Sequence, residues 1–193
     1  MANPRIHHRI AFFRESLRNL RSMGSVAPSS RFLCRAIARK INPEKDKIVV
    51  ELGPGDGVIT RFILNGLSPD ARLVIFEINP VFIEKISATF NDPRMTIVHD
   101  TAENMGHHFR EMGIQEVDCF VSGIPFVMLP ESLTERITRE CQSWLREGGR
   151  FIQFHYSPLL LRLYRRVFRN LHVEVVAFNI PPAIVISCEK LRV

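Results

Sequence analysis

A glycine-rich segment directly after an apolar run is the strongest chemical signal in the sequence. Residues 49–52 read Val-Val-Glu-Leu, and Gly53, Gly55 and Gly57 follow at alternate positions before a segment of helical character. Glycine adopts positive φ and has no Cβ, so such a corner lets the backbone approach a ligand closely. The spacing is GxGxG and not the GxGxxG of dinucleotide-binding folds, and the absence of a following Gly-Lys-Ser/Thr excludes a nucleotide-triphosphate loop.

Three carboxylates stand at or near the ends of the first three predicted strands. Glu51 precedes the glycines, where it would repel a pyrophosphate and favour a cationic ligand. Glu77 ends the second strand, where a carboxylate binds ribose hydroxyls, and Asp100 ends the third, placed to accept from an adenine amine. A solvated carboxylate at Glu77 and a capping carboxylate at Asp100 are the alternatives. Together the three groups predict a ligand with an amino acid, a ribose and an adenine, which describes S-adenosylmethionine.

The elements that must position these groups alternate between strand and helix. Apolar strands are predicted at 48–52, 73–77, 95–99, 117–121 and 150–156, separated by helices at 58–66, 80–90, 103–112 and 131–147. A helix at 159–170 precedes two closing strands, 173–179 and 183–190, which Pro181-Pro182 joins as a hairpin. This alternation predicts an α/β fold with a mostly parallel seven-stranded sheet and an antiparallel C-terminal strand. Ligands of such sheets bind at the carboxyl ends of the strands.

The basic charge is concentrated at one end of the chain. The net charge is +6, and residues 1–40 hold nine basic residues against Glu15 alone. An apolar stripe at helical spacing runs along this segment, formed by Ile6, Ile10, Phe13, Leu17 and Leu20. The pattern predicts a basic amphipathic helical arm over 1–40 and a domain over 41–193. Arginines beside such a stripe suit lipid phosphates, and packing of the helix on its own domain is the plain alternative.

Composition excludes several classes of protein. With 46% hydrophobic and 24% charged residues, the 193-residue chain buries a sizeable core, which excludes a mainly disordered protein. The four cysteines form no CxxC pair and are expected to be reduced thiols. No apolar stretch approaches the ~20 residues of a membrane span, and the N-terminus lacks the features of a signal peptide. The histidine pairs at 7–8 and 107–108 lack further ligands at useful spacing, so no metal is assigned.

The segment from Glu51 to Gly57, with the other strand-end carboxylates, resembles the class I S-adenosylmethionine-dependent methyltransferases. Within this class, the rRNA adenine dimethyltransferase family has a similar glycine loop and an Asn-Leu-Pro-Tyr/Phe motif after the fourth strand. The present chain has Ser122-Gly-Ile-Pro-Phe126 there, which lacks the amide that receives the adenine amine in that family.

The chain is more fully similar to the bacterial phospholipid N-methyltransferases and their ornithine-lipid relatives. Three motifs carry this likeness: Gly24-Ser-Val-Ala-Pro-Ser-Ser30, Ser122-Gly-Ile-Pro125 and Asn179-Ile-Pro-Pro-Ala183. The resemblance implies a Rossmann-like class I methyltransferase fold, S-adenosylmethionine as the cofactor, and methylation of phosphatidylethanolamine or a similar aminolipid. It also implies a cytoplasmic protein, expected as a monomer, that attaches peripherally to the anionic inner membrane surface through its N-terminal helix.

Site residues follow from the resemblance and from the strand ends. The cofactor-binding positions are Glu51, Gly53, Gly55, Gly57, Glu77, Asp100 and Ser122. The loop expected beside the reacting nitrogen consists of Ser122, Gly123, Ile124, Pro125 and Phe126. Pro125 would stiffen it, and the Phe126 ring would wall the pocket or hold a methylated ammonium. His155 is a candidate proton acceptor because imidazole titrates near neutrality, and a hydrogen-bonded structural histidine is equally compatible.

Three alternative functions are less well supported by the sequence. An RNA adenine N6-methyltransferase would use the arginines of residues 1–40 to bind the phosphates of the RNA backbone. A NAD-dependent oxidoreductase conflicts with the GxGxG spacing. A membrane-binding protein that keeps the cofactor without catalysis would have no need for the loop after the fourth strand.

Overall fold

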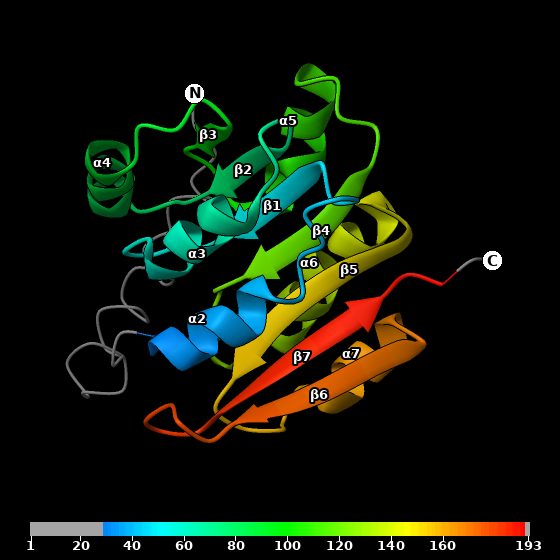
Figure 1. Ribbon diagram of the computed structural model, residues 1–193. Helices are drawn as coiled ribbons and strands as arrows, with labels where there is room; N and C mark the ends of the chain where they lie inside the picture. Colours follow the sequence, from blue (N-terminus) through cyan, green and yellow to red (C-terminus); the bar gives the residue numbers. More distant parts are fainter. Residues whose placement is uncertain (1–28, 192–193) are drawn as a thin grey trace.

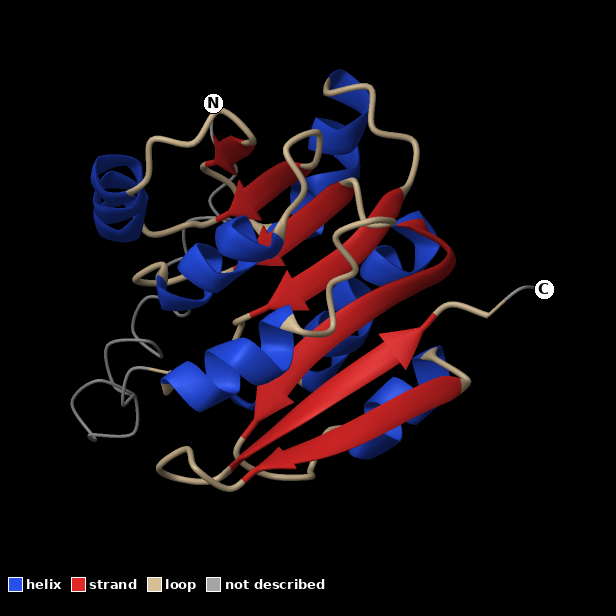
Figure 2. Ribbon diagram, in the orientation of Figure 1, coloured by secondary structure: helices blue, strands red, loops and turns tan. Residues whose placement is uncertain are grey.

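The computed structural model describes residues 29–191, and its centre is one mixed sheet (Figures 1 and 2). The seven strands lie in the order β3-β2-β1-β4-β5-β7-β6. Only β7 runs antiparallel to its neighbours β5 and β6, and the other pairs are parallel. The strand bounds are Ile48–Leu52 (β1), Arg72–Phe76 (β2), Met95–Val98 (β3), Val117–Ser122 (β4), Leu145–His155 (β5), Asn170–Val176 (β6) and Ala183–Glu189 (β7). The predicted fold class is confirmed.

Helices cover both faces of the sheet. Their bounds are Arg31–Ala38 (α2), Val58–Gly66 (α3), Pro80–Thr89 (α4), Met105–Glu111 (α5), Glu131–Trp144 (α6) and Leu161–Val167 (α7), with short 3₁₀ turns at Ala102–Asn104 (η1) and Phe126–Met128 (η2). The core against α2, α3 and α4 is separate from the core against α5, α6 and α7. Strand β1 contributes side chains to both cores, since Val49 faces the core under α2, α3 and α4 and Val50 faces the core under α5, α6 and α7. Within residues 29–191, no helix is long and apolar enough to cross a membrane.

The described part of the basic segment packs on the domain. Ser30 caps α2, since its side chain accepts a hydrogen bond from the Leu33 amide at 3.2 Å. Leu33, Cys34 and Ile37 are fully buried against the sheet face shared with α3. Helix α2 is therefore a structural part of the domain. The apolar stripe of residues 6–20 lies outside the described residues.

The start of β5 differs from the prediction. Helix α6 ends at Trp144 and the strand begins at once at Leu145, before Gly148-Gly149. The two glycines form a bulge inside the strand instead of a turn ahead of it: the β4–β5 register shifts there, and Gly148 has φ +70°. A Cβ on Gly149 would lie 3.0 Å from the Asp118 carbonyl oxygen, so the strands approach only because this residue is glycine.

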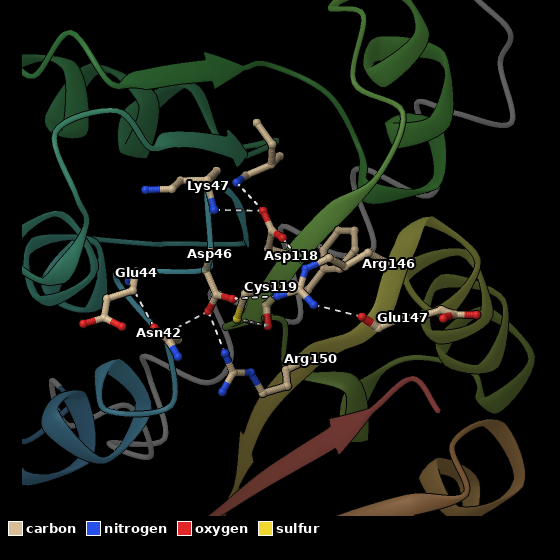
Figure 3. A network of polar contacts seen from close by, with 11 residues as sticks. Asn42, Glu44, Asp46, Lys47, Asp118, Cys119, Arg146, Glu147 and Arg150 are labelled. Carbon is tan, nitrogen blue, oxygen red and sulfur yellow. Dashed lines mark hydrogen bonds and ion pairs between the residues drawn. The ribbon is translucent and has the colours of Figure 1, made fainter. Parts of the chain in front are cut away.

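A network of acidic and basic side chains holds the amino ends of the central strands together (Figure 3). The Asp118 carboxylate accepts hydrogen bonds from the Lys47 and Ile48 amides at 2.8 and 2.7 Å and pairs with the Arg146 guanidinium. Fully buried Asp46 pairs with Arg150 at 2.8 Å. These contacts link the start of β1 to β4 and β5, at the end of the sheet opposite the glycine corner.

We expect Asp118→Ala to lower the free energy of unfolding by about 3 kcal/mol, because it leaves two amides without their acceptor and removes the nearer of the two carboxylates that pair with Arg146. Urea denaturation followed by circular dichroism measures the loss. Asp70→Ala is the control, because Asp70 forms an exposed pair with Lys47, 2.8 Å apart, which is screened by water. Equal unfolding midpoints for the two variants would contradict the structural importance of the network.

Candidate functional site

The glycine corner between β1 and α3 has the backbone that its sequence predicts. Gly53, Gly55 and Gly57 have φ of +65°, +60° and +79°, a region that L side chains rarely adopt. A Cβ on Gly57 would lie 2.8 Å from the Phe90 ring, so this glycine is also needed for packing. A Cβ on Gly55 would meet no atom within 4 Å. The middle of the corner therefore faces open space, where a ligand can approach the backbone.

Backbone hydrogen bonds tie neighbouring strand ends into one surface. The Gly53 amide donates to the Phe76 carbonyl at 2.9 Å, and the Gly123 amide donates to the Leu52 carbonyl at 2.8 Å. The loops after β1 and β4 touch, because a Cβ on Gly123 would lie 2.5 Å from the Gly53 carbonyl oxygen. The structure therefore brings the glycine corner and the Ser122–Phe126 loop into direct contact.

Glu51 is a buried acid on β1. Its carboxylate accepts a hydrogen bond from the Thr60 hydroxyl at 2.7 Å. Burial raises the pKa of Glu51 to about 8, and the nearby Glu77 carboxylate adds to the rise while the Thr60 bond opposes it. Within residues 29–191 no basic side chain forms an ion pair with Glu51. A cationic group beside it would supply the missing counter-charge, which fits the ammonium and sulfonium groups of S-adenosylmethionine.

Glu77 joins the end of β2 to the glycine corner. One carboxylate oxygen accepts from the Ile78 and Asn79 amides, both at 2.8 Å, and the other accepts from the Gly55 amide at 3.3 Å. Burial raises the pKa of Glu77, although these three amides favour its ionised form. The bonds hold the carboxylate against the open part of the corner, where a ribose is predicted to bind.

The Asp100 carboxylate is held by groups that follow it closely in the sequence. Its carboxylate accepts from the Thr101 amide at 2.7 Å and the Asn104 side-chain amide at 2.9 Å, and it lies 2.8 Å from His108 Nε2. Burial alone would raise the pKa of Asp100, but the bonds from His108, Asn104 and Thr101 bring it below its ordinary value. The N-cap of η1 is Thr101, so Asp100 precedes the cap and is bonded to Thr101, Asn104 and His108 instead of capping the helix. Binding of an adenine amine by Asp100 stays a prediction. The spacing of 100, 104 and 108 was the signal for the two missed partners.

The Ser122–Phe126 loop turns its polar atoms inward. Ser122 is fully buried, and its hydroxyl oxygen accepts from the Ile124 amide at 3.3 Å. The Phe126 ring is also fully buried and belongs to the core beneath α5, α6 and α7. The ring is thus a packing residue in this structure, and a direct contact with a methyl acceptor stays a prediction. The loop has no side-chain amide, and its Ile124, Pro125 and Phe126 carbonyls accept hydrogen bonds from the domain itself.

Gln153 is a site residue that the sequence reasoning missed. It lies on β5 opposite Ser122 in the strand register, and its side-chain amide donates to the Ile124 carbonyl at 3.1 Å. Its side chain is buried, and its Oε1 has no hydrogen-bond partner within the described part of the chain. The sequence signal for Gln153 was its single amide side chain within the apolar run Phe151–Phe154, because a buried polar group needs a hydrogen-bond partner.

His155, at the end of β5, contacts Tyr164 instead of the Ser122–Phe126 loop. Its Nε2 lies 2.8 Å from the Tyr164 hydroxyl, and burial lowers the pKa of His155 to about 4. The imidazole is therefore neutral at pH 7. This environment matches the structural histidine that the sequence left open, and a part in proton transfer stays a prediction.

We expect Gly123→Ala to separate the loops after β1 and β4, because the new methyl would overlap the Gly53 carbonyl oxygen. Thermal unfolding should show that the free energy of unfolding falls by about 2 kcal/mol or more, as at other overpacked sites. Gly66→Ala is the matched control: its Cβ meets nothing within 4 Å, and alanine is favoured over glycine in helices. A Gly123→Ala protein as stable as the Gly66→Ala protein would contradict the close approach.

Comparison with known proteins agrees with this geometry. The family model described as ribosomal RNA adenine dimethylase matches residues 21–121. The chain is 31% identical over 173 residues to an ornithine lipid N-methyltransferase of Singulisphaera acidiphila, covering 89% of this chain and 90% of that protein.

Solved structures of low sequence identity share the fold. A precorrin-6y C5,15-methyltransferase from Geobacter metallireducens superposes with a TM-score of 0.65 at 15% identity, covering 82% of this chain and 88% of that one. Human N-acetylserotonin methyltransferase in complex with S-adenosylmethionine gives 0.61 at 12% identity, covering 82% and 52%. The chain belongs to the class I S-adenosylmethionine-dependent methyltransferases, within the family described as ribosomal RNA adenine dimethylase, and S-adenosylmethionine is its cofactor.

Proposed function

We propose that the enzyme methylates the amine of an aminolipid headgroup, such as phosphatidylethanolamine or an ornithine lipid, at the surface of the inner membrane. The observation that carries the proposal is the similarity to a protein named ornithine lipid N-methyltransferase, which extends over 89% of this chain. The match also covers 90% of that protein, so the likeness extends over nearly the full length of both chains.

The residues at the carboxyl ends of β1 and β2 suit the cofactor. Gly53 and Gly55 give it access to the backbone, Glu51 balances its positive charge, and Glu77 binds its ribose. Bound there, S-adenosylmethionine supplies a methyl group on a positively charged sulfur. The Gly53–Gly123 contact then sets the Ser122–Phe126 loop beside the methyl donor.

The substrate amine must lose a proton before it can attack, since a primary ammonium has a pKa near that of lysine. The Ile124 carbonyl already accepts from the Phe126 amide and from the Gln153 side chain. The Oε1 of Gln153, which has no partner among residues 29–191, is therefore the candidate acceptor that would orient the amine N–H groups. His155, at the end of the strand that carries Gln153, is a poor proton acceptor while burial holds its pKa at about 4. It takes up the proton only if its contact with Tyr164 opens and water restores its ordinary pKa. Most of the acceleration then comes from positioning the amine in a site shielded from water.

Methylation of an RNA adenine is the second candidate function, favoured by the description of the family that matches residues 21–121. In the resembling RNA enzymes, an asparagine amide after the fourth strand receives the adenine amine. Here Ser122 and Gly123 take that place, and the Ser122 hydroxyl is already bonded within the loop. The site therefore favours an alkyl amine, which needs no partner on a base edge.

We expect the full chain to transfer labelled methyl groups from S-adenosylmethionine to aminolipids in vesicles. Phosphatidylethanolamine, an ornithine lipid, phosphatidylglycerol and ribosomal RNA are offered separately, and the products are read by mass spectrometry. Phosphatidylglycerol is the control without an amine. Methylated RNA with no methylated lipid would contradict the proposal and establish the second candidate.

We also expect cofactor binding at pH 7 to release a proton from Glu51, because a cation beside this buried acid favours its ionised form. Since burial raises the pKa of Glu51 to about 8, most of the free protein carries this proton at pH 7. Raising the pH through about 8 ionises Glu51 before the cofactor binds. The affinity for the cofactor should therefore increase with pH, and the release of a proton from Glu51 on binding should vanish.

Calorimetry in buffers of different ionisation heat counts the protons released. Glu51→Gln keeps the size of the side chain and removes the acid. Protons released by the ligand's own amine are counted in both proteins, so subtracting the two proton counts leaves the contribution of Glu51. A loss of roughly one proton in the variant supports the contact. Identical proton counts for both proteins would place the cationic groups away from Glu51.

A further inference from the structure

Large apolar side chains stand exposed along the carboxyl edge of the sheet, around the end of β5. They come from the first turn of α2, the loop after β5 and the β6–β7 connection, which gather at the lower left of Figure 1. Phe178 and Ile180 are 78% and 85% exposed. We call the group the apolar rim, which consists of Phe32, Tyr156, Leu159, Phe178 and Ile180.

A buried asparagine fixes the segments that carry the rim. Asn179 accepts a hydrogen bond from the Ser30 amide at 3.1 Å and donates to the Pro181 carbonyl at 2.7 Å. It also hydrogen-bonds Tyr156, which opposes the rise that burial causes in the pKa of that phenol. With Asn179 held inward, its chain neighbours Phe178 and Ile180 are left outside. The exposure of the two side chains is therefore a built feature of the hairpin.

This contact also joins two sequence motifs that the cofactor site does not use. Ser30 ends the Gly24–Ser30 motif, and Asn179 begins the Asn179–Ala183 motif, 149 positions later. Beside their junction, the Phe32 and Phe178 rings lie 5.5 Å apart. The two motifs thus cooperate to present aromatic and aliphatic side chains to the outside.

Basic side chains flank the rim. The Arg31 guanidinium lies 5.4 Å from the centre of the Phe32 ring. Arg31 and Arg35 on α2, and Arg162 on α7, are exposed, and none of the three forms an ion pair with another residue in the range 29–191. Glu174, an acid on the adjacent strand β6, is already neutralised by Arg39 and Lys40 at 3.0 and 2.8 Å. On the described residues of α2 and at the start of α7, the charges left without an ion pair are therefore positive.

We propose that the apolar rim is a membrane-docking surface, whose partner is the interface of an anionic lipid bilayer. The inference rests on the proposed function and adds to it a second contact, separate from residues 1–28. Apolar tips flanked by free arginines fit a bilayer, where the rings enter the acyl boundary and the guanidinium groups meet phosphates. Docking here turns the carboxyl edge of the sheet toward the headgroups.

The first test places a fluorescent probe on the rim. Phe178→Trp is made in a Trp144→Phe background, because the chain has one tryptophan. Vesicles of phosphatidylethanolamine and phosphatidylglycerol, with and without brominated acyl chains, are added to the full chain. We expect the emission to shift to the blue on binding and to be quenched by the brominated lipid.

Two results would overturn the proposal. Vesicle-bound protein in which the introduced indole keeps the emission of a water-exposed tryptophan would leave the rim outside the bilayer. A blue emission without vesicles, reversed by deleting residues 1–28, would make that segment the occupant of the rim.

The second test measures vesicle co-sedimentation of the double variant Phe178→Asp with Ile180→Asp. Loss of two exposed apolar side chains that docking would bury in the bilayer should lower the partition coefficient by about tenfold or more. Leu191→Asp is the matched control, since Leu191 is also apolar and exposed but lies past the opposite end of β7. Equal loss in the control, or full binding by the double variant, would contradict docking through the rim.

The two proposals fail in different ways. If the rim docks but the enzyme does not methylate aminolipids, the tryptophan is quenched while no methylated lipid forms. If the enzyme methylates aminolipids without using the rim, the double variant keeps both vesicle binding and wild-type rates. When both hold, the double variant loses activity on vesicles and recovers it on a short-chain aminolipid dissolved below its aggregation concentration.

Discussion

The contact between the backbones of Gly53 and Gly123 is the constraint on which the site depends. It is possible only because Gly123 has no Cβ, which would otherwise lie 2.5 Å from the Gly53 carbonyl oxygen. Parallel strands bring their carboxyl ends to one edge, but this contact makes the β1 and β4 loops a continuous surface. In the proposed mechanism, this contact keeps a fixed separation between the corner that would hold the cofactor and the loop that would hold the acceptor, because donor and acceptor must be aligned for a displacement reaction.

The two ends of the sheet have different tasks. At the amino ends, Asp46 and Asp118 neutralise arginines and tie β1, β4 and β5 together, so buried charge there serves stability. At the carboxyl ends, the buried acid Glu51 has no such partner within residues 29–191, and its pKa is raised to about 8. Ionising a buried acid without a counter-ion is costly, and we propose that a cationic ligand beside the glycine corner supplies the counter-charge.

Much of the fold followed from local patterns, and the contacts of the site did not. Strand β1 and helix α3 have the predicted bounds, because an apolar run, three glycines and a helical segment are local signals. The start of β5 was missed because Gly148-Gly149 serves either a turn or a bulge, and only the neighbouring strand decides. Gln153 and the partners of Asp100 depend on which side chains meet across the sheet or helix. The link between Ser30 and Asn179 spans the whole domain, and no local pattern reveals it.

A crystal structure of the full chain with S-adenosylhomocysteine tests the central claim most directly, since it shows which atoms surround the nucleoside and the sulfur. The account predicts ribose hydroxyls on Glu77, the amino acid group between Gly53 and Glu51, and the sulfur facing the Ser122–Phe126 loop. Electron density for the ligand at any other edge of the sheet, or a glycine corner left empty at saturating ligand, would contradict it.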